Sequence, residues 1–178
     1  MTVLDLHLLG SPVLREHSKT VLAVDDEVRR FIADLFETMY AARGVGLAAN
    51  QVGVARRVAV VDAEGEKLVL VNPRIVEASG KDTAEEGCLS IPDLFGDVTR
   101  PDRVVLEALD QDGNPYRREL TGLPARAVQH EIDHLDGILF LDHLSLLKRK
   151  RLLARWKKEH AEDSSYLRPV KPASAGST

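Results

Sequence analysis

The chain has 178 residues, of which 44% are apolar and 29% charged, and its formal net charge is −4. This length is enough for one soluble domain with a sizeable core. The mild acidity excludes a global attraction to nucleic acid or to an anionic membrane, so any basic binding site has to be local. The single cysteine, Cys88, excludes an internal disulfide and favours a reducing compartment.

The first residues read MTVLDLHLLGSPVL, with Asp5 and His7 inside a short apolar run and no basic leader. The run is far shorter than the roughly 18 apolar residues of a membrane span. We therefore expect a mature cytoplasmic protein.

The first predicted element is an amphipathic helix over residues 25–42, where apolar residues recur at helical spacing. Asp25 suits the N-cap and Gly44 suits the C-terminal end.

The middle of the chain is predicted to be mostly antiparallel sheet. Apolar, β-branched runs occupy residues 57–63 and 67–78. Residues 102–122 contain two further strand-like stretches, which Asp112-Gly113-Asn114 separates as a turn.

Two more helices are predicted at residues 123–136 and at about 144–162. The second places apolar residues on one side, namely Leu147, Leu152, Leu153 and Trp156. The last residues, 164–178, are rich in Pro, Ser, Ala and Gly and predict a flexible tail. We expect residues 1–163 to form a single catalytic domain.

This order of elements favours an α+β fold, with mostly antiparallel sheets around a central metal-binding helix and with an N-terminal helix and a C-terminal helix. The central helix would be the stretch QHEIDHLDG, Gln129 to Gly137. Burying its histidines and carboxylates without partners would be costly. Burial therefore favours a metal or a complete hydrogen-bond network there.

The spacing within this stretch fits a metal site. His130 and His134 are four residues apart, so they share one face of a helix and can bind one ion. Glu131 stands about 100° around the helix, beside the ion, where it suits a base that acts on a bound water. The alternative is a solvated, charged helix with accidental histidines.

A third ligand decides the type of site. A metzincin would carry a third histidine where this chain has Phe140, so that class is excluded. His143 and Glu159 are conceivable downstream ligands of a zinc peptidase, at spacings that do not favour it. Upstream, Cys88 follows Gly87, which permits close backbone approach, although a lone cysteine is often a small buried apolar residue.

Three stretches together resemble the signature motifs of the peptide deformylases, in that family's order. They are GVGLAANQVG (Gly44 to Gly53), EGCLS (Glu86 to Ser90) and QHEIDHLDG. The resemblance covers most of the chain and is strongest for the bacterial form of the family. It implies one divalent metal held by Cys88, His130 and His134, with water in the fourth position. Fe²⁺ is the expected ion, and Zn²⁺, Ni²⁺ or Co²⁺ can substitute.

The resemblance also implies the reaction, hydrolysis of the N-formyl group on the initiator methionine of a new polypeptide. In this hypothesis Glu131 takes a proton from the attacking water and returns it to the leaving amine. Gln51 and the backbone N–H of Leu89 are the implied donors to the negative oxygen.

Methionine selectivity implies an apolar pocket that accepts a long thioether side chain. The expected wall residues are Val45, Gly46, Glu86, Leu89 and Ala127. At the positions of Ala127 and its neighbour Arg126, bacterial relatives often carry larger apolar residues, so the shape of the pocket does not follow from the resemblance.

Two predictions concern the surroundings of the site. Asp133 and Asp136 are either acceptors that orient the histidines or ordinary helix-surface residues. The stretch KRKRLLARWKK, residues 148–158, is either a solvated basic face or a surface that docks on the ribosome, as in related bacterial enzymes.

Two other functions stay open at this point. A zinc endopeptidase would share the histidine motif but take its third ligand downstream and leave Cys88 idle. A non-catalytic relative would bind metal or formylated peptide without turnover.

Overall fold

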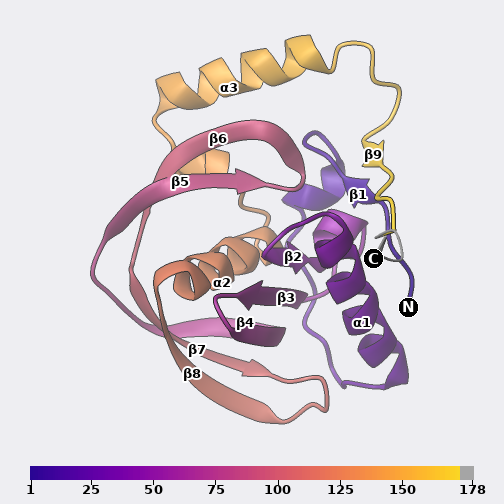
Figure 1. Ribbon diagram of the computed structural model, residues 1–178, viewed down its shortest axis with the longest axis vertical. Helices are drawn as coiled ribbons and strands as arrows, with labels where there is room; N and C mark the ends of the chain where they lie inside the picture. The colour runs from indigo at the N-terminus through magenta and orange to yellow at the C-terminus, as the bar shows by residue number, and fades with distance from the viewer. Residues whose placement is uncertain (173–178) are drawn as a thin grey trace, which may run out of the picture.

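The computed structural model describes residues 1–172. One helix, α2, lies at the centre, between a five-stranded sheet and a long hairpin, and α1 and α3 lie outside (Figure 1). In chain order the elements are β1 (Leu6–His7), η1 (Pro12–Arg15), α1 (Asp26–Ala41), β2 (Gly46–Ala48), η2 (Ala49–Val52), β3 (Val58–Ala63), β4 (Glu66–Ser79), β5 (Asp82–Cys88), β6 (Ile91–Arg100), β7 (Arg103–Leu109), β8 (Pro115–Thr121), α2 (Gly122–Leu135), η3 (Phe140–His143), α3 (Leu146–Glu159) and β9 (Leu167–Arg168). The predicted α+β fold around a central helix is confirmed.

The five-stranded sheet is antiparallel throughout, in the order β2-β3-β4-β7-β8. Its central strands are covered on both faces, which explains the nearly continuous apolar run of β3. Ala59 and Val61 pack in the cluster that holds α2, and Val58 and Val60 pack in the cluster that holds α1. Because side chains alternate along a strand, one strand serves two cores.

Helix α1 begins as predicted, since the Asp25 carboxylate accepts a hydrogen bond from the Val28 N–H at 2.9 Å. Its end differs from the prediction. Arg43, with φ of 60°, adopts the left-handed conformation, and the Gly44 N–H donates to the Met39 carbonyl at 2.9 Å. Gly44 therefore follows the left-handed residue instead of occupying that position.

Helix α2 matches the predicted range and is buried along most of its length. It ends where Gly137, with φ of 75°, passes the backbone of η1, and a Cβ there would lie 2.7 Å from the Arg15 carbonyl oxygen. Only glycine fits that combination of backbone angle and close approach.

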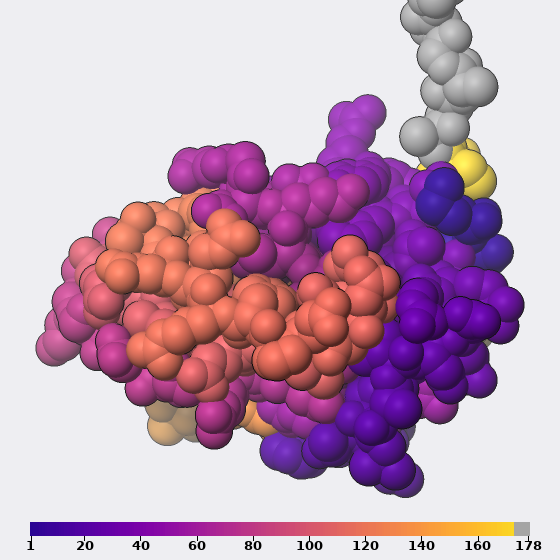
Figure 2. Space-filling model, turned by 90° about the horizontal axis from the view of Figure 1, so that it is seen from below, coloured from indigo at the N-terminus to yellow at the C-terminus, as the bar shows by residue number. Residues whose placement is uncertain are grey.

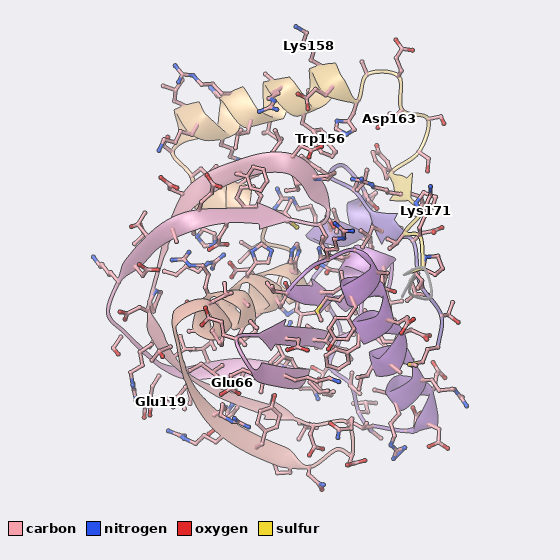
Figure 3. All side chains as sticks on the ribbon, in the orientation of Figure 1. Glu66, Glu119, Trp156, Lys158, Asp163 and Lys171 are labelled. Carbon is pink, nitrogen blue, oxygen red and sulfur yellow. The ribbon has the colours of Figure 1, made fainter. Side chains whose placement is uncertain are left out.

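Helix α3 is shorter than predicted and lies across the outside of the β5–β6 hairpin (Figure 1). Leu152, Leu153 and Trp156 pack in the cluster beneath it, and Figure 3 shows Trp156 on the inner side of α3 and Lys158 on the outer side. Leu147, predicted for the same apolar side, is 59% exposed. That prediction is wrong because Leu147 precedes Trp156 by nine residues, which at about 100° per residue puts it on the opposite side of the helix.

Part of the predicted tail forms a strand. β9 pairs with β1, and the Leu8 N–H donates to the Tyr166 carbonyl at 2.7 Å. Figure 2 shows the first residues of the chain beside the last described ones. The boundary predicted after residue 163, between the catalytic domain and the tail, stays a prediction, although the strand β9 lies beyond it. Residues 173–178 of the predicted tail lie outside the described range. Within residues 1–172, no helix has the length and hydropathy needed to cross a bilayer.

Candidate metal centre and active site

A thiol from β5 and two imidazoles from α2 lie close together. Cys88 ends β5, and its Sγ lies 3.3 Å from the Nε2 of His134, which lies 3.1 Å from the Nε2 of His130. Among the described residues this is the one cluster of its kind, with all ligand atoms within 4.8 Å of one another. Donors bound tetrahedrally to one ion lie about 3.3 to 3.6 Å apart, so these two pairs would move apart by only about 0.2 to 0.3 Å to hold an ion.

The chemistry of these donors fits a metal ion. The Nδ1 of His130 faces the Glu86 carboxylate at 2.9 Å, which leaves its Nε2 directed at His134. Burial lowers the pKa of His130, but hydrogen bonds to Cys88 and Glu86 outweigh burial and raise that pKa well above its ordinary value, so a metal ion would displace a proton from this ring. Burial lowers the pKa of His134 well below its ordinary value, which keeps that ring neutral. Two imidazoles and a thiol suit a transition metal or zinc.

The turn between β5 and β6 brings Cys88 to this point. The pairing of the two strands shifts register between Glu86 and Cys88. A Cβ on Gly87 would lie 2.8 Å from the Phe95 ring, so any other residue there would displace that ring. The glycine before the cysteine thus allows the close approach that the sequence suggested.

Glu131 lies in the same pocket and is 4% exposed. Its Oε2 has no hydrogen-bond partner among the described residues, and a Cβ on Gly46 would lie 2.5 Å from its Oε1. Burial raises the pKa of Glu131 to about 7, against the charges of His130 and Arg100, which lower it. A carboxyl that titrates near neutral pH suits proton transfer in both directions.

Gln51 reaches the cluster from η2 and is 1% exposed. Its Oε1 accepts a hydrogen bond from the Ala48 N–H at 2.9 Å, which fixes the direction of the amide. The Nε2 donates to the Ser90 Oγ at 3.1 Å and lies 3.5 Å from the Cys88 Sγ. The amide therefore presents its donors to the turn that carries Cys88 and Leu89.

Asn50, which the sequence reasoning did not single out, ties the first motif to α2. It is fully buried, and its Nδ2 donates to the His134 carbonyl at 2.5 Å. The signal that could have identified Asn50 was its position directly before Gln51. An amide side chain that is buried there needs a hydrogen-bond partner.

Glu86 does more than border the pocket. It is 6% exposed and bonds His130, while Arg100 and Arg126 donate to its carboxylate. Burial alone would raise the pKa of Glu86, but hydrogen bonds from His130 and Arg100 and the Arg100 charge hold it well below its usual range. The acceptor that orients His130 is thus a residue of the second motif.

The two aspartates considered for that task contact other groups. Asp133 accepts from Arg100 at 2.9 Å and lies 2.8 Å from the Nε2 of His143. Asp136 accepts from Arg57 at 2.9 Å. Neither has a recorded bond to His130 or His134, so the alternative that they orient these rings is not supported.

A cavity of about 750 Å³ opens beside the cluster. Its lining includes every predicted wall residue, namely Val45, Gly46, Glu86, Leu89 and Ala127. It also includes Phe95, Leu123 and residues 168–171 after α3, which the sequence reasoning left out, and Arg126, which it named only as the neighbour of Ala127. The end of the described chain therefore forms part of the cavity wall.

The downstream ligands of the peptidase alternative lie elsewhere. His143 is bonded to Asp133, and Glu159 accepts from Arg155 within α3 at 2.8 Å. Neither belongs to the metal cluster found among the described residues. The structure thus offers Cys88 as the third donor.

The chain matches the sequence profile described as polypeptide deformylase over residues 3–150. A peptide deformylase of Alkalilimnicola ehrlichii is 51% identical over 162 residues, covering 89% of this chain and 91% of the relative. The chain belongs to the polypeptide deformylase family. The relative from Brucella suis is 48% identical over 171 residues, covering 93% of this chain and 98% of the relative.

Solved deformylases share the fold. The Legionella pneumophila enzyme superimposes with a TM-score of 0.83 at 43% identity, covering 91% of this chain and 99% of the other. The Ehrlichia chaffeensis enzyme, solved with actinonin, gives 0.84 at 40% identity, covering 92% and 100%. Polypeptide deformylases are metal-dependent hydrolases that remove the formyl group from newly made peptides. The family, enzyme class and reaction predicted from the three motifs are therefore confirmed.

Proposed function

We propose that this chain hydrolyses the N-formyl group of the initiator methionine and releases formate, with a divalent metal held by Cys88, His130 and His134. The observation that carries the proposal is the convergence of these three donors beside the buried carboxylate of Glu131. The ion supplies a Lewis acid that lowers the pKa of water and polarises a carbonyl oxygen.

Glu131 transfers the proton. It adjoins His130 in the chain, and its Oε2 is free of protein partners among the described residues. It takes a proton from the attacking water and gives it to the departing amine, which leaves as a free N-terminus. Gly46 allows this carboxylate to lie against β2, because any side chain there would collide with it.

Gln51 and the Leu89 N–H stabilise the negative oxygen that forms on the formyl carbon. The Gln51 amide is held by Ala48 and directed at the turn after Cys88, so its position is fixed before substrate binds. Preorganised donors of this kind contribute about 2.7 to 4 kcal/mol each to transition-state stabilisation.

The peptide lies extended along β2. This strand is at one edge of the five-stranded sheet, and its first residue, Gly46, lines the cavity. An edge strand offers free backbone donors and acceptors to an added strand. Apolar side chains at the cavity, with Val45 44%, Phe95 55% and Leu123 39% exposed, suit a methionine side chain.

Fe²⁺ is the proposed physiological ion, and Zn²⁺, Ni²⁺ or Co²⁺ can replace it. A thiolate beside iron is sensitive to oxygen. The test is formate release from formyl-Met-Ala-Ser by protein purified without oxygen and loaded with each ion in turn. We expect turnover with all four and loss of the Fe²⁺ activity in air. Equal turnover of acetyl-Met-Ala-Ser, or none with either peptide, would refute the proposal.

We further propose that the enzyme works in the cytoplasm on nascent chains, with α3 docked on the ribosome. α3 carries seven lysines and arginines, of which Arg149 pairs with Asp142 and Arg155 with Glu159. Exposed cations suit RNA phosphate, and such binding weakens with salt. Ribosome pelleting should decrease as salt rises and disappear when Lys148 and Arg151 are changed to glutamate. Pelleting that survives both changes contradicts the docking.

A further inference from the structure

Arg126 is buried on α2 although it lines the cavity, with 8% of its surface exposed. Its Nη1 donates to the Glu86 carboxylate and to the Val98 carbonyl, the latter at 2.9 Å. Its Nη2 donates to the carbonyl and carboxylate of Asp82 at 2.8 and 3.1 Å. One guanidinium thus ties α2 to both β5 and β6, the hairpin that carries Cys88.

The Glu86 carboxylate divides its two oxygens between neighbours. Oε1 faces the His130 Nδ1 at 2.9 Å and accepts from Arg100 at 3.0 Å. Oε2 accepts from Arg100 at 2.6 Å and from Arg126. Arg126 and His130 are four residues apart and share one face of α2. Glu86 therefore bridges one turn of the helix while Arg100 holds it from β6.

We propose that Arg126 is a positioning residue for the metal centre. It fixes Glu86 so that His130 directs its Nε2 at the ion, and it sets the distance between the hairpin with Cys88 and the helix with both histidines. This inference rests on the proposed metal site. It assigns this positioning role to a residue outside the three motifs that identify the family.

The bonds to Asp82 and Val98 separate this role from that of Arg100. Arg100 contacts Glu86 and Asp133, whereas Arg126 alone joins the start of β5 to α2. Without Arg126, Glu86 keeps Arg100 and His130 but loses its second partner on α2, and the hairpin loses three further bonds to the helix, from Val98 and Asp82. Acceptors behind metal-bound histidines typically change metal affinity by about 10- to 100-fold, and the retained Arg100 places the expected change near the lower value.

The experiment is a Co²⁺ titration of the metal-free protein, followed by the thiolate-to-cobalt absorption band. We expect Arg126→Met to weaken Co²⁺ binding about tenfold and to shift the band. Arg126→Lys keeps a cation beside Glu86 but cannot reach all four acceptors, so about threefold weakening is expected. The matched control is Arg118→Met, since Arg118 is exposed on β8 and pairs with Glu66 at 2.9 Å. It should bind Co²⁺ as wild type does.

The outcomes separate the two proposals. Wild-type affinity and an unchanged band in Arg126→Met overturn the positioning role. If that variant does not fold, Arg126→Lys decides, and wild-type affinity with an unchanged band overturns the role. Failure of the wild-type chain to bind Co²⁺ through a thiolate contradicts the metal site itself, and with it the proposed function.

Discussion

Helices α2 and α3 have the same length but opposite surroundings. α2 buries arginine, glutamate and histidine side chains at the centre of the fold, and most of their polar atoms have hydrogen-bond partners. α3 buries one side chain, Trp156, and exposes most of its cations. Buried polar groups must be paired or used, whereas exposed charges are solvated at little cost. Substitutions around α2 should therefore change chemistry, and those on α3 should change stability or partner binding.

The largest expected effect comes from Cys88→Ala. Loss of the thiolate should release the metal and reduce formate production by about a thousandfold, since the ion supplies several kcal/mol of transition-state stabilisation. Metal analysis and turnover are the measurements. His143→Ala is the control, because that imidazole lies outside the cluster. Metal retained in Cys88→Ala but lost in His143→Ala would instead favour the downstream ligands of a zinc peptidase.

Gln51→Leu tests the proposed oxyanion donor while the metal ligands stay in place. We expect kcat to fall by about 10²- to 10³-fold with unchanged metal content and little change in KM. Ser90→Ala removes the hydroxyl that accepts from Gln51 but leaves the amide, so its loss should be much smaller. A rise in KM alone would show that Gln51 only helps to bind the peptide.

Trp156→Ala addresses α3. This side chain is 7% exposed and stacks on His160 with ring centres 3.6 Å apart. Its removal should lower the free energy of unfolding by about 3 kcal/mol, as measured by urea denaturation. Metal content and kcat of the folded protein should stay at wild-type levels. A large loss of kcat would break the proposed division between the two helices.

The smallest effect concerns Asp142 in η3, which connects the two helices. Burial raises the pKa of Asp142, but hydrogen bonds from Arg15 and the Leu139 N–H outweigh this and lower it. A lowered carboxyl pKa stabilises the folded state above the ordinary aspartate range, and this contribution is lost as the pH falls through the folded pKa.

Asp142→Asn should therefore be less stable than wild type by on the order of 1 kcal/mol at neutral pH. The difference should shrink in acid, which urea denaturation at about pH 7 and about pH 3 can measure. A difference that is independent of pH would mean that the carboxylate charge contributes nothing.

The sequence predicted those elements that are marked by a periodic apolar pattern, by a capping residue or by a short motif. Helices α1 and α2 follow from periodicity and from the Asp25 cap, and the three motifs identified the family. Leu147 was wrongly assigned to the packed side of α3, because its separation of nine residues from Trp156 turns it to the opposite, exposed side of the helix. β9 was missed since its partner, β1, lies at the other end of the chain.

The sequence predicted which residues form the candidate site more reliably than it predicted which of them contact one another. The three donors converge, and the expected wall residues line one cavity. The orienting acceptor was sought among Asp133 and Asp136, near His130 in the chain, but Glu86 provides it from another element. Arg126 appeared only as an uncertain pocket residue, because nothing in one sequence shows that its guanidinium reaches both β5 and β6.

We assign to Glu131 the proton transfer beside a metal that this carboxylate does not itself hold. The most direct measurement compares formate release from formyl-Met-Ala-Ser by wild type and Glu131→Ala, both purified without oxygen and shown to carry the same metal content. We predict robust turnover for wild type and a loss of at least about 10²-fold in the variant. Equal turnover would contradict the assigned role of Glu131, and no turnover by metal-replete wild type would instead indicate a non-catalytic binder of formylated peptides.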